Sequence, residues 1–324
     1  MRVAVTRRIP QAGLDLLSQR VEVAVWPGSL PPTREELIAF AAGADGLLTL
    51  LTERIDAAVL DALPSVRVVS NMAVGYDNID VDAATRRGVV VCITPDVLTE
   101  TTADFTFALM LAVARQLKPA AESVLRGDWK TWEPMGFLGQ DVYGATIGIV
   151  GLGRIGQAVA RRARGFDMTV LYTDTVRRPD VERELDARQV SLDALLRESD
   201  VVTLHVPLTE ETRGLIGAEQ LRLMKPTAIL INTSRGAVVD TEALADALER
   251  GQIWGAGLDV TNPEPLPADH RLVRLPNVLV TPHIASASDA TRTRMAQLAS
   301  QNLLAALQNE RPPRALNWEA VRGH

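Results

Sequence analysis

Three side chains capable of acid–base or ionic chemistry each follow a separate apolar stretch in the second half of the chain: Arg235, Glu264 and His283. A protonated histidine can donate a proton to a carbonyl oxygen that gains negative charge during reduction. A neighbouring carboxylate would orient the histidine ring and favour its charged form. An arginine can hold a substrate carboxylate through its forked guanidinium. Together the three residues predict the reduction of a small keto acid without a metal ion.

Each of the four histidines also has a structural interpretation. His324 is the terminal residue and His270 lies in a charged stretch, so both are expected to be solvated. His205 could simply cap the end of its strand. For His283 a catalytic role is favoured, because two other charged residues occupy matching strand ends.

A glycine-rich turn follows the predicted strand 146–150 and opens a helix predicted over Ile155–Arg164. Its sequence is Gly151-Leu-Gly153-Arg-Ile-Gly156. The first glycine permits a tight turn, the second lets a pyrophosphate approach the backbone, and the third lets the helix pack closely on the strand. Free N–H groups at the start of the helix would face the anion. In this strand–turn–helix setting, the motif predicts dinucleotide binding rather than a structural turn alone.

The acidic residue Asp174 ends the next predicted strand, 18 residues after the last glycine of the turn. There a carboxylate would bind the ribose 2′-hydroxyl of NAD and repel the 2′-phosphate of NADP. Arg177 and Arg178 follow closely, and they could either receive that phosphate or be solvated loop residues. NAD(H) is therefore favoured, with NADP(H) as the alternative.

The elements that must position these residues are short strands alternating with helices, which indicates parallel sheets covered on both faces. The predicted strands are 3–5, 21–25, 46–50, 66–69 and 89–91, then 146–150, 168–172, 201–206, 228–231, 255–260 and 278–281. Thr33 predicts a capping box at the start of one of the first helices. A long Ala-rich helix over Thr99–Leu117 and an irregular stretch from Arg126 to Gly144 separate the two series. We therefore expect two α/β domains of the doubly wound parallel type, with boundaries near residues 98 and 285.

Composition excludes several other classes of protein. Of the 324 residues, 47% are hydrophobic and 23% are charged, which is typical of a chain that packs a core. The net charge of −6 argues against nucleic acid or an anionic membrane as a partner. A single cysteine, Cys92, excludes an intramolecular disulfide framework. No secretory leader is recognised and no apolar segment reaches the ~20 residues that span a bilayer, so a cytoplasmic location is expected.

Several longer motifs, in order along the chain, resemble those of the D-isomer-specific 2-hydroxyacid dehydrogenases. They are VGYDNID (74–80), TPDV (94–97), TETTAD (99–104), GLGRIG (151–156), HVPLT (205–209), NTSRG (232–236), LDV (258–260) and TPHI (281–284). The resemblance covers essentially the whole chain. It implies a Rossmann cofactor domain over 99–285 and a flavodoxin-like substrate domain over 1–98, completed by 286–324. It also implies a homodimer formed through the cofactor domains.

The resemblance further implies roles for single residues. Arg235 would bind the substrate, His283 would be the acid–base, and Glu264 would pair with it. Asp259 would contact the nicotinamide carboxamide. The other implied cofactor-binding positions, besides the three glycines and Asp174, are Thr102, Arg154, Ile155, His205, Val206, Pro207, Thr212, Thr233, Ser234 and Ala285. The substrate would be bound by Leu51 and by the backbone at Val74 and Gly75.

Within the family, the stretches 5–10, 129–134 and 138–144 are most similar to glyoxylate and hydroxypyruvate reductases. In those enzymes a tryptophan of the second stretch reaches the partner subunit's site, and Trp132 is the matching residue. Packing at a dimer interface would explain the same tryptophan equally well. Ala285 replaces a glycine found in many members, and a contact through its backbone N–H would survive that change. The expected reaction is reduction of glyoxylate or hydroxypyruvate by a nicotinamide cofactor.

Other activities share the same fold. A formate dehydrogenase would carry glutamine in place of Glu264, and a phosphite dehydrogenase would carry lysine in place of Val74, so both are disfavoured. Another D-2-hydroxyacid dehydrogenase remains an alternative. A non-catalytic, NADH-sensing interaction protein also remains open, because such proteins keep the three charged residues.

Overall fold

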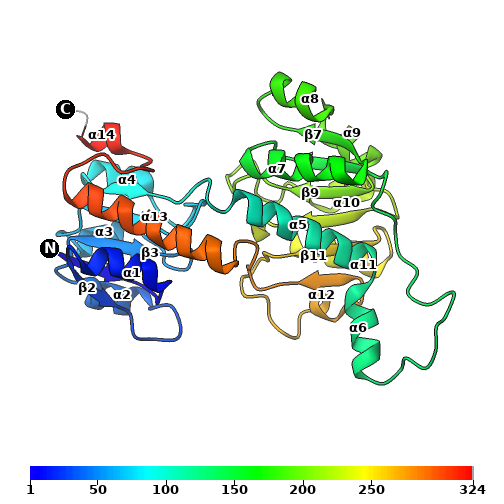
Figure 1. Cartoon of the computed structure of the whole chain (residues 1–324), viewed down its shortest axis with the longest axis horizontal. Coiled ribbons are helices and arrows are strands. Elements are labelled where there is room, and N and C mark those ends of the chain that lie inside the picture. The colour runs from blue at the N-terminus through cyan, green and yellow to red at the C-terminus, as the bar shows by residue number, and fades with distance from the viewer. Residues whose placement is uncertain (323–324) are drawn as a thin grey trace. The chain divides into compact units, whose positions relative to one another are not determined.

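The computed structural model describes residues 1–322, and the chain divides into two compact units (Figure 1). Unit 1 consists of Met1–Leu98 together with the residues from Ala287 onward, and unit 2 consists of Thr99–Ser286. His324, expected to be solvated, lies outside the described residues. Among residues 1–322, no helix combines the length and the apolar character needed to cross a bilayer.

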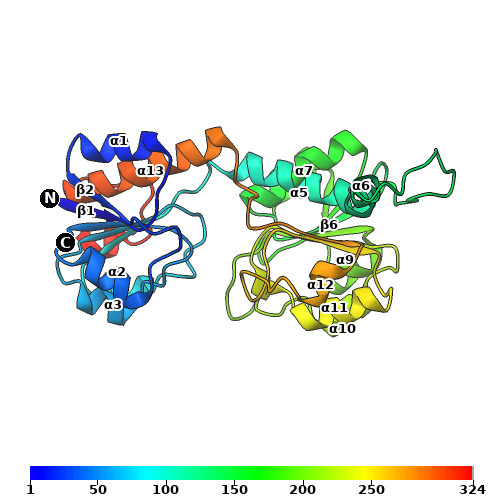
Figure 2. The same cartoon turned by 90° about the horizontal axis from the view of Figure 1, so that it is seen from below.

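Unit 1 is built on a five-stranded parallel sheet with the strand order β2-β1-β3-β4-β5. The strands are β1 (Arg2–Val5), β2 (Glu22–Val25), β3 (Gly46–Thr49), β4 (Val68–Asn71) and β5 (Val90–Cys92). Helices α1 (Gln11–Ser18) and α13 (Asp289–Leu307) lie on one face, and α2 (Arg34–Ala41) and α3 (Ala57–Ala62) lie on the other (Figure 2). This covering explains why every residue of β3 and β4 is buried.

Two local features fix these helices. The predicted capping box is confirmed, because Thr33 accepts a hydrogen bond from the Glu36 N–H and the Glu36 carboxylate accepts one from the Thr33 N–H. Gly13 allows α1 to approach α13 closely, since a Cβ there would lie 2.8 Å from the Cβ of Ala296. The Ser300 hydroxyl of α13 donates to the Gly13 carbonyl at 2.9 Å. The last long helix therefore belongs structurally with the first.

Unit 2 contains a seven-stranded parallel sheet with the order β12-β11-β10-β9-β6-β7-β8. The strands are β6 (Thr146–Val150), β7 (Thr169–Thr173), β8 (Ala187–Gln189), β9 (Val201–Leu204), β10 (Ile229–Asn232), β11 (Gly255–Leu258) and β12 (Val278–Val280). The chain reverses its direction of winding between β6 and β9, which is the switch point of a Rossmann sheet. The doubly wound α/β prediction is confirmed for both sheets, and all eleven predicted strands are present with ends shifted by at most two residues.

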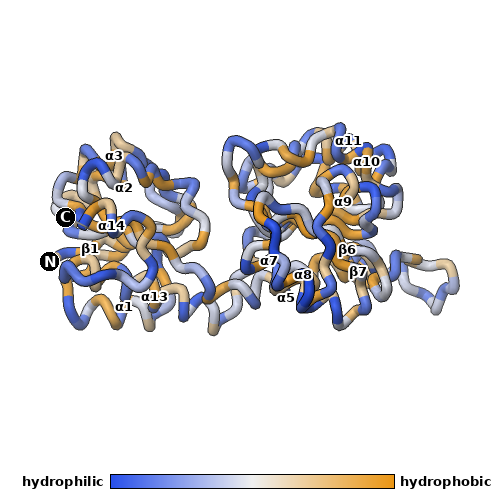
Figure 3. Tube along the Cα trace, turned by 90° about the horizontal axis from the view of Figure 1, so that it is seen from above, coloured by the Kyte–Doolittle hydropathy of each residue, from blue (hydrophilic) through white to orange (hydrophobic). Residues whose placement is uncertain are grey.

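Helices cover both faces of the second sheet (Figure 2). One face carries α5 (Thr99–Ala114) and α7 (Arg154–Ala163), and the other carries α9 (Leu192–Glu198), α10 (Ala218–Leu223) and α11 (Thr241–Glu249). Alternate strand residues supply the two cores: Ile147 and Ile149 pack with α5 and α7, whereas Val150 packs with the opposite helices. Hydrophobic residues concentrate around β6 and β7, and hydrophilic ones recur along α7 and α8 (Figure 3). The shorter helices are α4 (Val81–Arg86), α6 (Leu117–Leu125), α8 (Pro179–Leu185), α12 (Arg271–Arg274) and α14 (Trp318–Arg322), with 3₁₀ turns at Arg164–Phe166 and Gly236–Val238.

The prediction of one long helix over Thr99–Leu117 is wrong in its extent. Helix α5 ends at Ala114, and α6 begins at Leu117 after Gln116 adopts a left-handed backbone conformation (φ 51°). The segment 126–145 after α6 forms an extended excursion from the body of unit 2 (Figure 1). The edge strand β8 was not predicted, and it adds a seventh strand beside β7.

Candidate active site

Three neighbouring strands carry the residues expected to perform the chemistry. Arg235 follows β10, Glu264 follows β11, and His283 follows β12. These strands are adjacent and parallel, so their carboxyl ends open on the same edge of the sheet. The structure therefore brings the three loops together, as the sequence predicted.

A short hydrogen bond joins the imidazole of His283 to the carboxylate of Glu264. The distance between Nδ1 and Oε1 is 2.6 Å, and both side chains are partly exposed. The carboxylate thereby fixes the orientation of the ring and favours a proton on Nδ1, leaving Nε2 as the nitrogen that can exchange a proton with a ligand. His283 also has a left-handed backbone (φ 56°), which is uncommon for a non-glycine residue and must be stabilised by its surroundings.

Asp259 supplies much of that stabilisation. Its buried carboxylate accepts hydrogen bonds from the Thr281 hydroxyl (2.7 Å), the Ile284 N–H (2.8 Å) and the Ala285 N–H (2.7 Å). Its backbone carbonyl accepts the N–H of His283 at 2.9 Å. Burial raises the pKa of Asp259, and the hydrogen bonds act in the opposite direction. In this structure, Asp259 holds the loop that carries His283, and the N–H of Ala285, predicted as a cofactor contact, is bonded to Asp259.

The loop after β10 is shaped by Asn232, a residue that the sequence interpretation did not single out. Its Oδ1 accepts hydrogen bonds from the N–H and the hydroxyl of Ser234, and its Nδ2 donates to the Arg235 carbonyl at 2.9 Å. An asparagine at a strand end commonly bonds the backbone two residues further on, which was the available signal. At Gly236 an added Cβ would lie 1.9 Å from the Thr261 carbonyl oxygen, so the loops after β10 and β11 touch.

The glycine turn after β6 fits a bound dinucleotide. Gly151 has a φ of +93°, and a Cβ on Gly156 would lie 2.2 Å from the Gly151 carbonyl oxygen, so both positions require glycine. A Cβ on Gly153 would meet nothing within 4 Å, which leaves open space in front of the turn. Gly153 caps α7 without a side-chain hydrogen bond, so the N–H groups at the helix start are available to an anion. Arg154 and Ile155 are the first two residues of this helix.

Asp174 lies against this turn at the end of β7. Its Oδ2 accepts the Leu152 N–H at 2.8 Å, and its Oδ1 accepts the Val176 N–H at 3.1 Å. Of the two arginines that follow, Arg177 is held by Glu182, with Nη2 and Oε2 2.9 Å apart. The structure thus places the carboxylate of Asp174 against the glycine turn, and it pairs Arg177 with the carboxylate of Glu182.

His205 follows β9 on the other side of the switch point. Its Nε2 lies 2.9 Å from the Thr203 hydroxyl, as expected of a strand-end cap. Its Nδ1 is buried and has no hydrogen-bond partner among residues 1–322. Burial lowers the pKa of His205 to about 3, so the ring is neutral. An unpartnered buried nitrogen beside the glycine turn is a further feature that a cofactor could satisfy.

Three of the remaining predicted cofactor-binding residues are threonines: Thr102, Thr212 and Thr233. The Thr106 hydroxyl bonds the Thr233 hydroxyl (3.0 Å) and donates to the carbonyl of Thr102 (2.9 Å), which links α5 to the loop carrying Arg235. The Thr212 hydroxyl donates to the Pro207 carbonyl at 2.6 Å and closes the loop after His205. Val206 packs on the turn, since its Cγ1 lies 2.9 Å from the position of a Cβ on Gly151.

The predicted substrate-binding positions lie elsewhere in the chain. Leu51 follows β3, and Val74 and Gly75 follow β4, all in unit 1. Trp132 belongs to the excursion 126–145 of unit 2, and its side chain is 80% exposed. Within residues 1–322, no group of three or more histidine, cysteine or acidic side chains is arranged to hold a metal ion.

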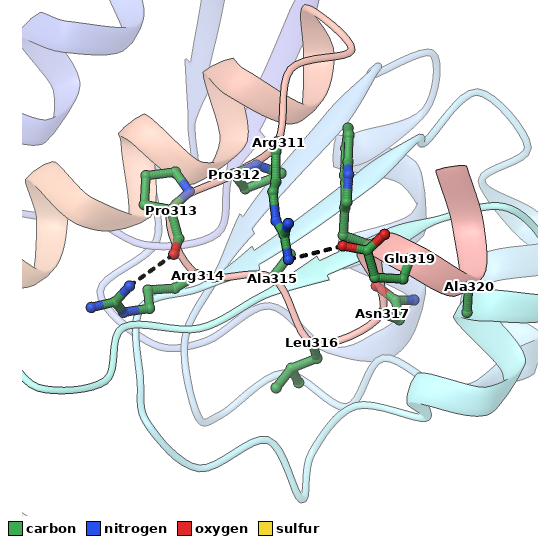
Figure 4. A pocket seen from close by; sticks show the side chains of 10 residues that line it. Arg311, Pro312, Pro313, Arg314, Ala315, Leu316, Asn317, Glu319 and Ala320 are labelled. Carbon is green, nitrogen blue, oxygen red and sulfur yellow. Dashed lines mark hydrogen bonds and ion pairs between the residues drawn. The ribbon is translucent and has the colours of Figure 1, made fainter. Parts of the chain in front are cut away.

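A hollow in unit 1 lies beside the segment 311–320 (Figure 4). Arg311 is paired with Glu319 at 2.8 Å, and Arg314 donates to the Pro313 carbonyl and to Asp96, each at 3.0 Å. Because both guanidiniums already have partners, this hollow provides little uncompensated charge for a ligand.

A Rossmann sheet with a glycine turn at its switch point, and a histidine–carboxylate pair on the same edge, defines a nicotinamide-dependent dehydrogenase. Residues 107–285 match the family model described as "D-isomer specific 2-hydroxyacid dehydrogenase, NAD binding domain". The chain belongs to this family of oxidoreductases, which confirms the resemblance seen in the sequence.

Individual relatives are similar over nearly their whole length. The chain is 55% identical to a glyoxylate reductase of Korarchaeum cryptofilum, over 99% of this chain and 97% of the relative. The crystal structure of the TT0316 protein from Thermus thermophilus has a TM-score of 0.93 and 50% identity, covering 98% of this chain and 100% of that one. An NADPH-dependent glyoxylate/hydroxypyruvate reductase from Sinorhizobium meliloti, solved with NADP and malonate, has a TM-score of 0.85 and 33% identity, covering 97% and 96%.

Proposed function

We propose that the chain reduces glyoxylate, and hydroxypyruvate as a related substrate, to the corresponding 2-hydroxy acid with NADH. The observation that carries this proposal is the 2.6 Å bond between His283 and Glu264 on the cofactor edge of the sheet. Relatives of similar length that are half identical to the chain are named glyoxylate reductase, which supports this choice of keto acid.

In the proposed reaction, Arg235 binds the keto acid and His283 delivers a proton from Nε2 to the carbonyl oxygen. The nicotinamide, when bound, supplies the hydride that goes to the carbonyl carbon. Glu264 stabilises the charged imidazole before the transfer and keeps its Nδ1–H oriented afterwards. The proton and the hydride together convert the carbonyl to an alcohol, so the step balances with no further reactant. Leu51 and the backbone at Val74 and Gly75 would bind the substrate carboxylate.

The cofactor preference is proposed from the surroundings of the ribose position. Asp174 offers a carboxylate there, and Arg177 is occupied by Glu182, so the 2′-phosphate of NADP would meet a negative group. NAD(H) is therefore favoured, and NADP(H) is the alternative. The first domain, Met1–Leu98 completed from residue 286 onward, would bind the substrate, and 99–285 would bind the cofactor.

The direct test is the decay of NADH absorbance at micromolar enzyme with glyoxylate, hydroxypyruvate and pyruvate, repeated with NADPH. We expect the highest kcat/KM with glyoxylate or hydroxypyruvate and NADH. Higher kcat/KM with pyruvate would assign another D-2-hydroxyacid dehydrogenase activity. Tight NADH binding without turnover of any 2-keto acid would instead indicate a cofactor-sensing interaction protein.

We also propose that the protein works as a homodimer. The excursion 126–145 carries large apolar side chains that are mostly exposed, among them Trp129 (70%), Trp132 (80%) and Met135 (77%). Exposed apolar surface of this kind commonly marks an interface with another chain. A second copy would cover these residues, and Trp132 is the residue proposed to reach the partner's site.

A further inference from the structure

The carboxyl edge of the sheet in unit 1 holds a cluster of polar side chains that the proposed mechanism does not use. They are Thr6, Thr49, Glu53, Asn71 and Asn78, and all but Asn78 are buried to at least 97%. The strand order β2-β1-β3-β4-β5 reverses between β1 and β3, so the switch point of this sheet lies between the loops that follow these two strands. Ligands of open α/β sheets bind at such points.

Glu53 joins the two sides of this switch point. Its Oε2 accepts the Thr6 hydroxyl, which follows β1, at 2.6 Å and the Leu50 N–H, which follows β3, at 2.8 Å. Its Oε1 accepts the Thr52 hydroxyl. The carboxylate thus receives three hydrogen bonds, and it folds the loop 50–53 around itself with Leu51 between two bonded residues.

Two asparagines connect this loop with the loop after β4. Asn78 donates both hydrogens of its Nδ2, to the carbonyls of Leu50 (2.9 Å) and Glu53 (2.8 Å). Asn71 donates both hydrogens of its Nδ2, to the carbonyl of Gly75 (3.0 Å) and to Oδ1 of Asn78 (3.3 Å), and its Oδ1 accepts the Thr49 hydroxyl (3.2 Å). Every amide hydrogen of both side chains is therefore used, and a fully satisfied network of this kind holds a single arrangement.

The network holds backbone carbonyl groups in place and leaves neighbouring backbone N–H groups available to a ligand. The carbonyls of Leu50, Glu53 and Gly75 are bonded within it. Within residues 1–322, the N–H groups of Leu51, Val74 and Gly75 donate to no backbone carbonyl. Backbone N–H groups that are held in place and unpartnered form a binding surface for an anion such as a carboxylate.

We propose that Asn71 and Asn78, supported by Glu53, are positioning residues that hold the N–H groups of Leu51, Val74 and Gly75 in the arrangement that receives the substrate carboxylate. This inference rests on the proposed function. It adds that the affinity for the keto acid depends on two side-chain amides, one buried (Asn71) and one partly exposed (Asn78), that do not themselves touch the substrate.

Asn317 provides a matched control within the same unit. It is also a buried asparagine with three hydrogen bonds, accepting the Val91 N–H (2.8 Å) and donating to the Thr85 hydroxyl (2.8 Å) and the Val89 carbonyl (3.0 Å). Its bonds fasten the segment 311–320, drawn in Figure 4, to β5 and α4, and they do not involve the loops after β3 or β4. A purely structural role for Asn71 predicts that Asn71→Ala and Asn317→Ala have the same kinetic consequences.

The experiment compares wild type, Asn71→Ala, Asn78→Ala and Asn317→Ala in glyoxylate reduction, in inhibition by oxalate, and in NADH binding followed by fluorescence. For Asn71→Ala and Asn78→Ala we expect KM for glyoxylate and Ki for oxalate to rise about tenfold, the effect of one lost or misplaced hydrogen bond, with kcat changed less and the Kd of NADH unchanged. Asn317→Ala should lower the midpoint of thermal unfolding to a similar extent without raising KM or Ki. The effects of Asn71→Ala and Asn78→Ala should combine less than additively, because they act through one network.

A KM and Ki for both variants within twofold of wild type, while wild type reduces glyoxylate, would overturn this inference and leave the proposed function standing. An equal rise of KM in Asn317→Ala would also overturn it, since a general loosening of the unit would then be responsible. Absence of turnover by wild type would overturn the proposed function and this inference with it. If Asn71→Ala does not fold, Asn78→Ala decides the outcome alone, because Asn78 is partly exposed and its loss leaves the Asn71–Thr49 bond in place.

Discussion

The imidazole of His283 has a carboxylate at one nitrogen, so a single nitrogen remains to exchange a proton with a ligand. Replacing His283 by alanine should lower kcat by about 10²–10⁴, because general acid catalysis is lost, and should leave the Kd of NADH nearly unchanged. Steady-state kinetics and fluorescence titration measure these two quantities. His270→Ala is the matched control, since His270 also contacts a carboxylate in unit 2, that of Glu242 at 3.1 Å. Normal turnover by His283→Ala would remove His283 from the mechanism.

Asp174 is the residue on which the cofactor preference should depend. Its side chain lies against the glycine turn and would offer negative charge to the ribose of the proposed cofactor. Asp174→Ala should lower kcat/KM for NADH and raise it for NADPH, so that the ratio between the cofactors narrows. Asp180→Ala removes an exposed carboxylate nearby on α8 and should leave the ratio unchanged. An unchanged ratio in Asp174→Ala would show that another residue discriminates between the cofactors.

Single residues were predictable where their chemistry is unusual for a strand end. Arg235, Glu264 and His283 could be selected because charged side chains rarely follow three neighbouring apolar strands without a function. The residues that hold these three in place were harder to predict from the sequence. The Asn232 turn is a local pattern and could have been recognised, whereas the support of the His283 loop by Asp259 depends on contacts over more than 20 residues of sequence. The network of Asn71 and Asn78 likewise becomes visible only when the loops are placed side by side.

Among the helices and strands, Lys118 makes an unusual connection. From the first turn of α6 its ammonium donates to three carbonyls, those of Val273 in α12, Leu275 in the connecting loop and Val278 in β12, at 2.9–3.0 Å. Lys118→Met would leave these carbonyls without their donor and should lower the free energy of unfolding by roughly 2–4 kcal/mol. Urea denaturation measures this change. Lys130→Met is the control, because that exposed lysine bonds one carbonyl only. Equal stability of the two variants would contradict this interpretation.

His205, which follows β9, should make the free energy of unfolding depend on pH. Burial lowers the pKa of His205 from 6.5 to about 3, so below pH 6.5 the unfolded chain binds a proton that the folded chain does not. The free energy of unfolding is therefore not reduced by His205 above pH 6.5. Between pH 6.5 and about pH 3 it falls as the pH falls, by up to ~1.4 kcal/mol per pH unit. Urea denaturation at pH 7 and pH 5 should show a smaller loss for His205→Asn than for wild type. The same loss in both proteins would mean that His205 is protonated in the folded state.

Element boundaries show what the sequence could not provide. The strands were recognisable because short β-branched runs alternate with helices. The edge strand β8 consists of Ala-Arg-Gln and has no alternation of apolar and polar residues, so its local sequence does not predict a strand. The end of α5 has a tertiary cause: the returning chain donates from the Gln140 N–H to the Ala114 carbonyl, and Gln116 donates to the carbonyl of Leu138. Similarly, a 3₁₀ turn follows α7, and the left-handed residue after it is Asp167 rather than Gly165.

For the molecule as a whole, the exposed excursion 126–145 predicts self-association. The double variant Trp129→Asp/Trp132→Asp should sediment as a single chain, whereas wild type should sediment at twice that mass, because charges would be buried in the apolar interface. Sedimentation velocity at micromolar concentration distinguishes the two. Leu30→Asp changes an equally exposed apolar residue in unit 1 and should not alter the mass. A monomeric wild type would contradict the proposed dimer.

The way α13 returns to unit 1 determines the order in which the two units can be completed on the ribosome. The strands β3, β4 and β5 lack the cover of α13 until residues 289–307 have been synthesised, and until then α1 lacks its close contact between Gly13 and Ala296. Residues 99–286 contain all of their own sheet and both of its cores. The middle of the polypeptide is therefore expected to resist proteolysis first during translation, although the amino-terminal segment leaves the exit tunnel before it.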